Sequence, residues 1–143
     1  MYSPTVWTAF HFLLYALHIT YHANMTILVV DDNQKTLRYL KRALAKYGYT
    51  VVISDNAKDA LSILSQTAID LILADINMPE MDGFEFCRIV REQKGEEYLP
   101  LIFLTARSTV DDVATGLIAG ADDYLTKPVR LKKLVEKIQE YAM

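Results

Sequence analysis

Five side chains with useful chemistry lie at the ends of short apolar runs. Asp31 and Asp32 follow TILVV, Asp75 follows DLILA, Thr105 ends PLIFLT, and Lys127 comes just after DYLT. Carboxylates that are crowded together raise one another's pKa, so a positive charge must hold these three ionised. Carboxylates without a His or Cys partner are typical of a Mg²⁺ site, because Mg²⁺ prefers oxygen ligands.

The same side chains are suited to bind a phosphoryl group. Mg²⁺ and Lys127 would neutralise its oxygens, Thr105 would donate a hydroxyl hydrogen bond, and Asp75 would be the nucleophile that becomes an acyl phosphate. The alternative is that the aspartates only cap the turns and helices after their strands. Capping would explain any one of them, but it does not explain the whole set.

Other phosphate chemistries lack their motifs here. The sequence contains no G-x-x-x-x-G-K-[ST] loop and no G-x-G-x-x-G after a strand. A phosphatase with an aspartyl nucleophile usually has a second acid two residues later, where this chain has Asn77. Residues 25–143 also contain no histidine that could act as a base or a phosphoryl carrier. We therefore expect the phosphoryl group to come from elsewhere.

The apolar runs alternate with helical patterns from Thr26 onward, five of each. The expected strands are nearly continuous in apolar residues, which indicates burial on both faces and a parallel sheet between helices. Such alternation predicts right-handed crossovers and a doubly wound α/β domain. Ligands of these sheets bind beyond the carboxyl ends of the strands, where the five side chains are expected.

Each expected helix has an apolar face with spacings of three and four residues. The predicted faces are Leu37, Leu40, Leu44 and Tyr47; Ala57, Ala60, Leu61 and Leu64; Phe86, Ile89 and Val90; Val110, Val113, Ala114 and Leu117; and Leu131, Leu134, Val135 and Ile138. Asn56 is expected to cap the second helix, and Ser108 with Asp111 fits a capping box for the fourth. Gly48 and Gly120 follow expected helix ends.

Composition limits the classes of function. The chain has 143 residues, 52% of them hydrophobic, which suffices for one packed domain. A net charge of -3 gives no overall attraction to nucleic acid or an anionic membrane. The single cysteine, Cys87, is expected to be a small buried apolar residue, and a reducing cytoplasmic setting is the default.

Residues 1–24 carry no Lys, Arg, Asp or Glu. They match neither a signal peptide nor a membrane span, and we expect a helix from about Pro4 to Tyr21. His11, His18 and His22 fall on one stripe of that helix. One interpretation is that the stripe binds a metal, and the other is that it is the more polar side of an apolar helix. The segment is either an accessory helix or a non-native leader before a start at Met25.

The motifs VVDD, DINMPEMDG, LTA and ADDYLTKP together resemble the receiver domain of bacterial two-component response regulators, over residues 25–143. The resemblance implies a flavodoxin-like, five-stranded parallel sheet of strand order 2-1-3-4-5 with helices on both faces, and a signalling domain rather than an enzyme. It implies Asp75 as the phosphoacceptor. Mg²⁺ would be bound by Asp31, Asp32, Asp75 and the backbone carbonyl of Asn77.

The resemblance also implies a switch. Thr105 and Tyr124 match the family's switch pair, and Lys127 matches its lysine, followed by a cis proline. Phosphorylation would let Thr105 swing to the phosphoryl group and Tyr124 turn inward, changing the surface of the fourth helix, fifth strand and fifth helix. Arg107 and Asn77 lie where the family varies the lifetime of the phosphate.

The expected partners are a histidine kinase or histidine phosphotransfer protein and a downstream protein target, and homodimerisation on activation is left open. No direct nucleic-acid or membrane partner is expected. The first helix carries a set of cations that could help dock the phosphodonor or simply form a solvated face: Lys35, Arg38, Lys41, Arg42 and Lys46. The alternatives to a stand-alone regulator are the excised regulatory part of a longer transcription factor or enzyme, and a small phosphatase.

Overall fold

The computed structural model describes residues 25–95 and 97–141. In this part of the chain, five strands alternate with five helices, as the sequence predicts. The strands are β1 (Thr26–Val30), β2 (Thr50–Ser54), β3 (Leu71–Ala74), β4 (Leu101–Thr105) and β5 (Asp123–Thr126). The helices are α2 (Gln34–Ala45), α3 (Ala57–Gln66), α4 (Gly83–Lys94), α5 (Val110–Ala119) and α6 (Leu131–Tyr141). The helix predicted near the N-terminus, and its histidine stripe, lie outside the described residues.

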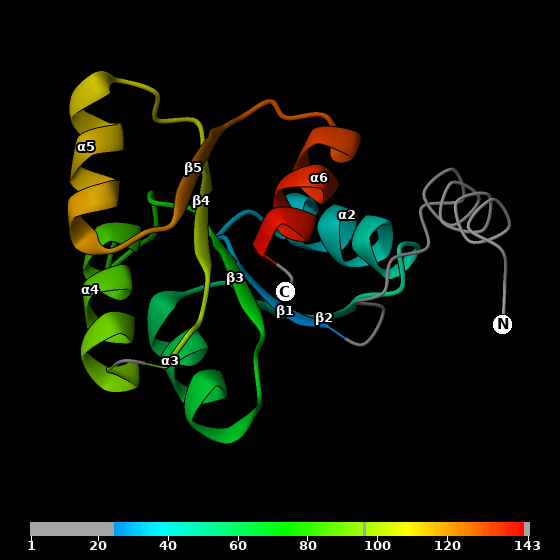
Figure 1. Ribbon diagram of the computed structural model, residues 1–143, viewed down its shortest axis with the longest axis horizontal. Coiled ribbons are helices and arrows are strands. Elements are labelled where there is room, and N and C mark those ends of the chain that lie inside the picture. The colour runs from blue at the N-terminus through cyan, green and yellow to red at the C-terminus, as the bar shows by residue number, and fades with distance from the viewer. Residues whose placement is uncertain (1–24, 96, 142–143) are drawn as a thin grey trace, which may run out of the picture.

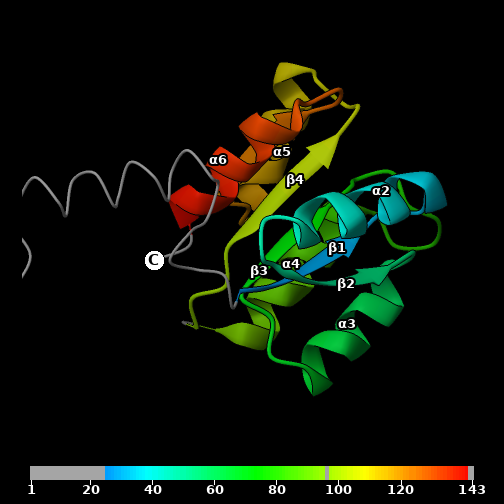
Figure 2. The same ribbon diagram turned by 90° about the vertical axis from the view of Figure 1, so that its right-hand side faces the viewer.

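The strands form one parallel sheet in the order β2-β1-β3-β4-β5, which confirms the expected topology. Val30 at the end of β1 pairs with Ser54 of β2 and with Ala74 of β3. Thr105 at the end of β4 pairs with Thr126 of β5. The carboxyl ends of the strands therefore meet at one edge of the sheet (Figure 2).

Helices cover both faces of this sheet. In Figure 1, α2 and α6 lie on one face, and α3, α4 and α5 lie on the other. One buried cluster joins Ile27 and Leu73 of the sheet to Leu37 and Leu134 of the two helices on their side. The second joins Leu28 and Ile72 to the other three helices. Burial on both faces explains why the strand sequences are continuous apolar runs.

Four of the five predicted helix faces point into the core. Their fully buried members are Leu37, Leu40 and Leu44 of α2, Ala57, Ala60 and Leu64 of α3, Phe86 and Val90 of α4, and Leu134, Val135 and Ile138 of α6. Asn56 caps α3 as predicted, because its side chain accepts a hydrogen bond from the Asp59 amide at 2.8 Å. Gly120 ends α5 in the left-handed conformation, again as predicted.

The predicted face of α5 is wrong. Val110 is 85% exposed and Leu117 50% exposed, while Gly116 and Ala119 are buried instead. A side chain at Gly116 would have its Cβ 3.1 Å from the rings of Phe103 and Tyr124. The helix therefore packs against the sheet through its smallest residues, and its larger apolar residues face outward.

The predicted cap of α5 is also wrong, by one residue. Thr109, rather than Ser108, is the N-cap, and its side chain accepts a hydrogen bond from the Asp112 amide at 3.1 Å. Asp111 and Asp112 both lie in the first turn, where negative charge is favourable.

Cys87 is fully buried, as expected. Its thiol donates to the Ala119 carbonyl at 3.5 Å, and burial raises its pKa to about 11, so it stays an unreactive thiol at neutral pH. Within the described ranges, every helix is too short or too polar to cross a lipid bilayer.

Candidate functional site

The site lies at the carboxyl edge of the sheet, and backbone hydrogen bonds extend the ladder into it. The Asp75 amide donates to the Val30 carbonyl at 2.8 Å, and the Lys127 amide donates to the Thr105 carbonyl at 2.8 Å. Both residues therefore leave their strands in fixed directions. Lys127 is followed by a cis peptide bond to Pro128, as the family resemblance implies.

The side chain of Lys127 joins two of the three aspartates. Its Nζ lies 2.6 Å from Asp31 Oδ2 and 3.2 Å from Asp75 Oδ2. Asp31 is only 3% exposed, and Lys127 and Asp75 are half-buried. A partly dehydrated ammonium group shared by two carboxylates is the central feature of the site.

The third aspartate completes an acidic cluster. One carboxylate oxygen from each of Asp31, Asp32 and Asp75 can be chosen so that all lie within 4.8 Å of one another. Asp32 is exposed, which leaves the cluster open to solvent on that side. Three hard oxygen donors without a nitrogen or sulfur ligand fit Mg²⁺. The residues present therefore have the donor chemistry that this ion requires.

Backbone amides hold two of these carboxylates in place. Asp31 Oδ1 accepts from the Asn33 amide at 2.9 Å, and Asp75 Oδ1 accepts from the Ile76 amide at 2.6 Å. In each case the other oxygen, Oδ2, is the one that Lys127 contacts. The aspartates are therefore fixed before any ligand arrives, as a preorganised site requires.

Burial and charge set the protonation of the pair that crosses the site. Burial raises the pKa of Asp31 above its usual value, although hydrogen bonds from Lys127 and Asn33 oppose this rise. Burial alone would lower the pKa of Lys127, but its hydrogen bonds and charge interactions with Asp31 and Asp75 outweigh it, and the net pKa is raised. Lys127 therefore stays charged at neutral pH, and the negative cluster favours a further cation.

Thr105 and Tyr124 meet through a third residue. Thr105 is fully buried, and its Oγ1 accepts from the Arg107 amide at 3.3 Å. The Tyr124 hydroxyl donates to the Arg107 carbonyl at 2.7 Å, and its ring packs edge-on against Phe103 with the centroids 6.0 Å apart. The two predicted switch residues are thus linked by the backbone of Arg107.

Asn77 lies on the exposed rim of the site, and the role predicted for its carbonyl stays a prediction. Its side-chain oxygen accepts a long hydrogen bond of 3.5 Å from Arg107. Met78 is buried, and Met81 packs against the same buried cluster, so both take part in the packing of the loop that follows Asp75.

Gly83 is a positioning residue that the sequence reasoning missed. A Cβ at this position would lie 2.7 Å from the Ile76 Cα and would also clash with the Asp75 carbonyl. The Gly83 amide donates to the Ile76 carbonyl at 2.8 Å, which folds the loop back on itself. The glycine of the MDG motif was the available signal, since a close backbone approach requires the smallest residue.

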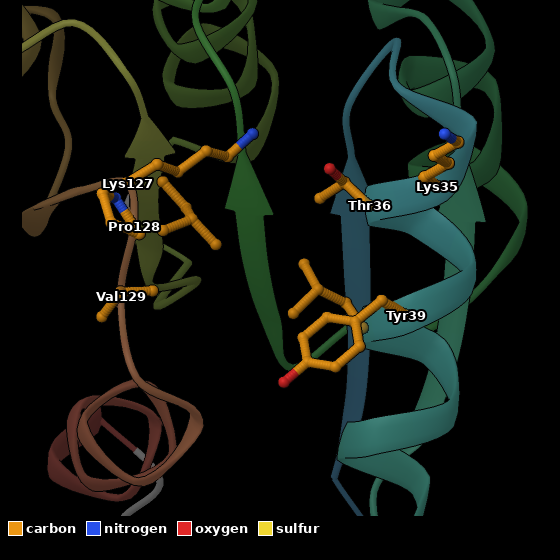
Figure 3. Close-up of a pocket in the computed structure, with 8 residues that line it drawn as sticks. Lys35, Thr36, Tyr39, Lys127, Pro128 and Val129 are labelled. Carbon is orange, nitrogen blue, oxygen red and sulfur yellow. The ribbon is translucent and has the colours of Figure 1, made fainter.

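A groove opens beside Lys127 that no local sequence pattern indicates. It has a volume of about 490 Å³ and runs between α2 and the segment after β5. Figure 3 shows Thr36 and Tyr39 on one wall, facing Pro128 and Val129 on the other. Lys35 and Lys127 supply its charged groups. The walls come from segments far apart in the chain, so only the fold brings them together.

This arrangement defines an α/β domain with an acidic, lysine-bridged site at the carboxyl edge of its sheet. Comparison with protein families matches residues 27–139 to the response regulator receiver domain. The chain therefore belongs to the response regulator receiver domain family.

Individual relatives agree with this placement. An uncharacterized 14.6 kDa protein from the sodA1 3' region of Leptolyngbya boryana is 44% identical over 121 residues, covering 85% of this chain and 92% of that protein. The transcriptional regulatory protein PcoR of Escherichia coli is 42% identical and is matched over 79% of this chain. The chain spans about half of PcoR, 49% of its length.

Solved structures share the fold. The chemotaxis response regulator CheY4 of Vibrio cholerae superposes with a TM-score of 0.77 at 30% identity, over 82% of this chain and 98% of that one. The BeF3-activated DrrB receiver domain gives 0.74 at 30% identity, over 82% and 97%.

Proposed function

We propose that this domain accepts a phosphoryl group on Asp75 from a phosphohistidine of a partner protein and signals by changing its surface. The observation that carries this proposal is the contact of Lys127 with both Asp31 and Asp75, beside the third carboxylate of Asp32. This places one fixed ammonium group at the carboxylate that would become the acyl phosphate. Membership of the receiver family supports the same assignment.

In the proposed transfer, a carboxylate oxygen of Asp75 attacks the phosphorus of the phosphohistidine. A P–O bond forms as the P–N bond breaks, and the imidazole leaves with the bonding electrons. Lys127 neutralises charge on the phosphoryl oxygens, and hydrolysis by water later returns the free carboxylate and inorganic phosphate. Asp31, Asp32, Asp75 and the Asn77 carbonyl are the proposed holders of Mg²⁺, which would supply a second positive charge to the phosphoryl oxygens.

The proposed output is a surface change near α5, β5 and α6. Thr105 is buried at the end of β4 with its hydroxyl beside Arg107, so it is placed to exchange that bond for one to a phosphoryl oxygen. Tyr124 packs against α5 at Gly116, so any movement of its ring must change the packing of that helix. A downstream protein that contacts these elements would then distinguish the two states.

The proposed phosphodonor is a histidine kinase or a histidine phosphotransfer protein of the same cytoplasmic compartment. The groove between α2 and Pro128 supports this, because it leads to Lys127 and its walls are largely apolar. Along α2, the side chains of Arg38, Lys41 and Arg42 are exposed. A partner with an apolar ridge and acidic flanks would complement this surface.

The test is labelling of the purified protein with acetyl phosphate and Mg²⁺, followed by intact-mass measurement. The wild type should gain one phosphoryl group, and Asp75→Ala should gain none. Asp111→Ala, which removes an exposed aspartate of α5, is the matched control and should label normally. Uptake of phosphate by Asp75→Ala would refute the assignment.

A further inference from the structure

Arg107 connects more of the site than any residue singled out by the family motifs. It lies in the loop after β4, where its amide donates to Thr105 Oγ1 at 3.3 Å and its carbonyl accepts from the Tyr124 hydroxyl at 2.7 Å. One residue's backbone therefore joins both hydroxyl groups of the proposed switch. A shift of this loop must change both contacts together.

The guanidinium of Arg107 makes a second set of contacts. Its Nε and Nη2 donate to Asp112 Oδ1 at 3.1 and 2.6 Å, in the first turn of α5. Its Nη1 donates to Asn77 Oδ1 at 3.5 Å, in the loop that follows Asp75. The hydrogen bond to Asp112 raises the pKa of Arg107, and in return lowers the pKa of Asp112, so both remain charged. The side chain thus bridges the loop that follows Asp75 and the first turn of α5.

The aromatic ring of Phe84 packs against this guanidinium. Its central carbon lies 5.3 Å from the centroid of the Phe84 ring, at the start of α4. Phe84 contacts Phe103 edge-on at 5.7 Å, and Phe103 contacts Tyr124 in the same way at 6.0 Å. These three rings therefore connect the guanidinium of Arg107 to Tyr124, whose hydroxyl donates to the Arg107 carbonyl.

From these contacts we infer that Arg107 is a positioning residue that clamps the Asn77 loop to the first turn of α5, so that a change at Asp75 reaches α5 through its side chain. This inference rests on the proposed function. Arginine suits the task because its planar fork offers several donors in fixed directions, whereas a lysine ammonium is a single point charge. Because the side chain of Arg107 is 39% exposed, its pair with Asp112 contributes to geometry rather than to stability.

Three variants separate the parts of the clamp. Arg107→Ala removes the guanidinium, and Arg107→Lys keeps the charge but loses the fork. Asp112→Asn keeps the shape of the α5 partner and removes its charge. Arg88→Ala is the matched control, because Arg88 is an exposed arginine of α4 that lies one helical turn after Phe84 and is not one of the contacts described above.

The first measurement uses the unphosphorylated proteins and compares backbone amide NMR spectra. Arg107→Ala should shift the amides of both the Ile76–Asn77 segment and the first turn of α5, and Arg107→Lys should do the same. Asp112→Asn should shift the Asn77 amide as well as α5, because the guanidinium loses its anchor. Shifts confined to one side of the clamp would overturn the inference.

The second measurement adds acetyl phosphate and Mg²⁺ and follows the amides of α5. In wild type and Arg88→Ala, labelling should move them. In Arg107→Ala, Asp75 should still be labelled, but the α5 changes should shrink about twofold or more, the usual size of a lost coupling. Undiminished α5 changes in a labelled Arg107→Ala would contradict the clamp. A wild type that takes up no phosphoryl group would refute the proposed function instead, and the first measurement would still decide the clamp.

Discussion

Lys127 Nζ lies 2.6 Å from Asp31 Oδ2, although 96 positions separate the two residues in the chain. The strands that precede them, β5 and β1, are not neighbours, since β3 and β4 lie between them in the sheet. The lysine side chain therefore reaches across the carboxyl ends of two strands, passing Asp75 on the way. This contact therefore links residues that follow β1, β3 and β5.

Removal of that lysine should cost stability as well as function. Lys127→Ala leaves the buried carboxylate of Asp31 without its cation, and an uncompensated buried group of this kind costs about 1–3 kcal/mol. Urea unfolding at pH 7 without divalent ions measures the loss. Lys132→Ala, an exposed position of α6, is the control and should change the free energy of unfolding by less than about 0.5 kcal/mol. Equal stability of the two variants would contradict the role given to Lys127.

Magnesium should stabilise the folded protein, because it relieves the repulsion among the three carboxylates. At a Mg²⁺ concentration tenfold above Kd, the free energy of unfolding should rise by about 1.4 kcal/mol. Asp32→Asn should lose most of this increment, whereas Glu92→Gln on the exposed side of α4 should keep it. Thermal unfolding with Mg²⁺ and with EDTA provides the measurement. An unchanged increment in Asp32→Asn would remove Asp32 from the proposed ligands.

Gly83→Ala should disturb the loop that follows Asp75. The added Cβ meets backbone atoms of Asp75 and Ile76, which cannot rotate away, so we expect a loss of about 1–3 kcal/mol and slower labelling of Asp75. Gly95→Ala is a useful comparison, because the space around Gly95 is open but its φ is +59°. It should lose about 1 kcal/mol or more through backbone strain, with normal labelling. Normal labelling of Gly83→Ala would show that the close approach is dispensable.

Stability should fall in acid partly through Asp123. Burial alone would raise the pKa of this carboxyl, but hydrogen bonds from the Tyr124 amide, Lys137 and Tyr141 outweigh burial, and the net pKa lies below its usual value. Its contribution is therefore fully present above the unfolded-state pKa of about 3.9 and is lost as the pH falls through the lower folded-state value. The stability gap between wild type and Asp123→Asn should thus be largest near neutral pH and shrink below about pH 4. Urea unfolding of both proteins across this pH range measures the gap. A gap that does not change with pH would contradict the prediction.

The exposed residues of α5 provide a test of which face of this helix packs against the core. Ile118 is 86% exposed and Ile138 of α6 is fully buried. Ile138→Ala should cost about 2–5 kcal/mol, because it opens a cavity in the core. Ile118→Ala should change the free energy of unfolding by less than about 0.5 kcal/mol. A large loss at Ile118 would mean that this face is packed in the intact protein.

The sequence alone determined which segments form strands and helices, because the spacing of apolar residues that marks each kind of element is a local property of the chain. TILVV and LILA are buried on both faces, and the leucines of α2 recur at helical spacing. It also determined that Asp31, Asp75 and Lys127 share an edge, since parallel strands all end on the same side. The composition of that set was enough to predict a site for Mg²⁺ and a phosphoryl group before any distance was known.

Only the tertiary structure decided how α5 lies and what Arg107 contacts. Helical spacing indicates that some face is buried, but Gly116 lets α5 approach Tyr124 closely and turns Leu117 outward. The partners of the Arg107 side chain come from three separate segments, and the groove beside Lys127 has walls from α2 and from the segment after β5. Contacts between residues distant in sequence depend on how the elements pack, and no local period records that packing.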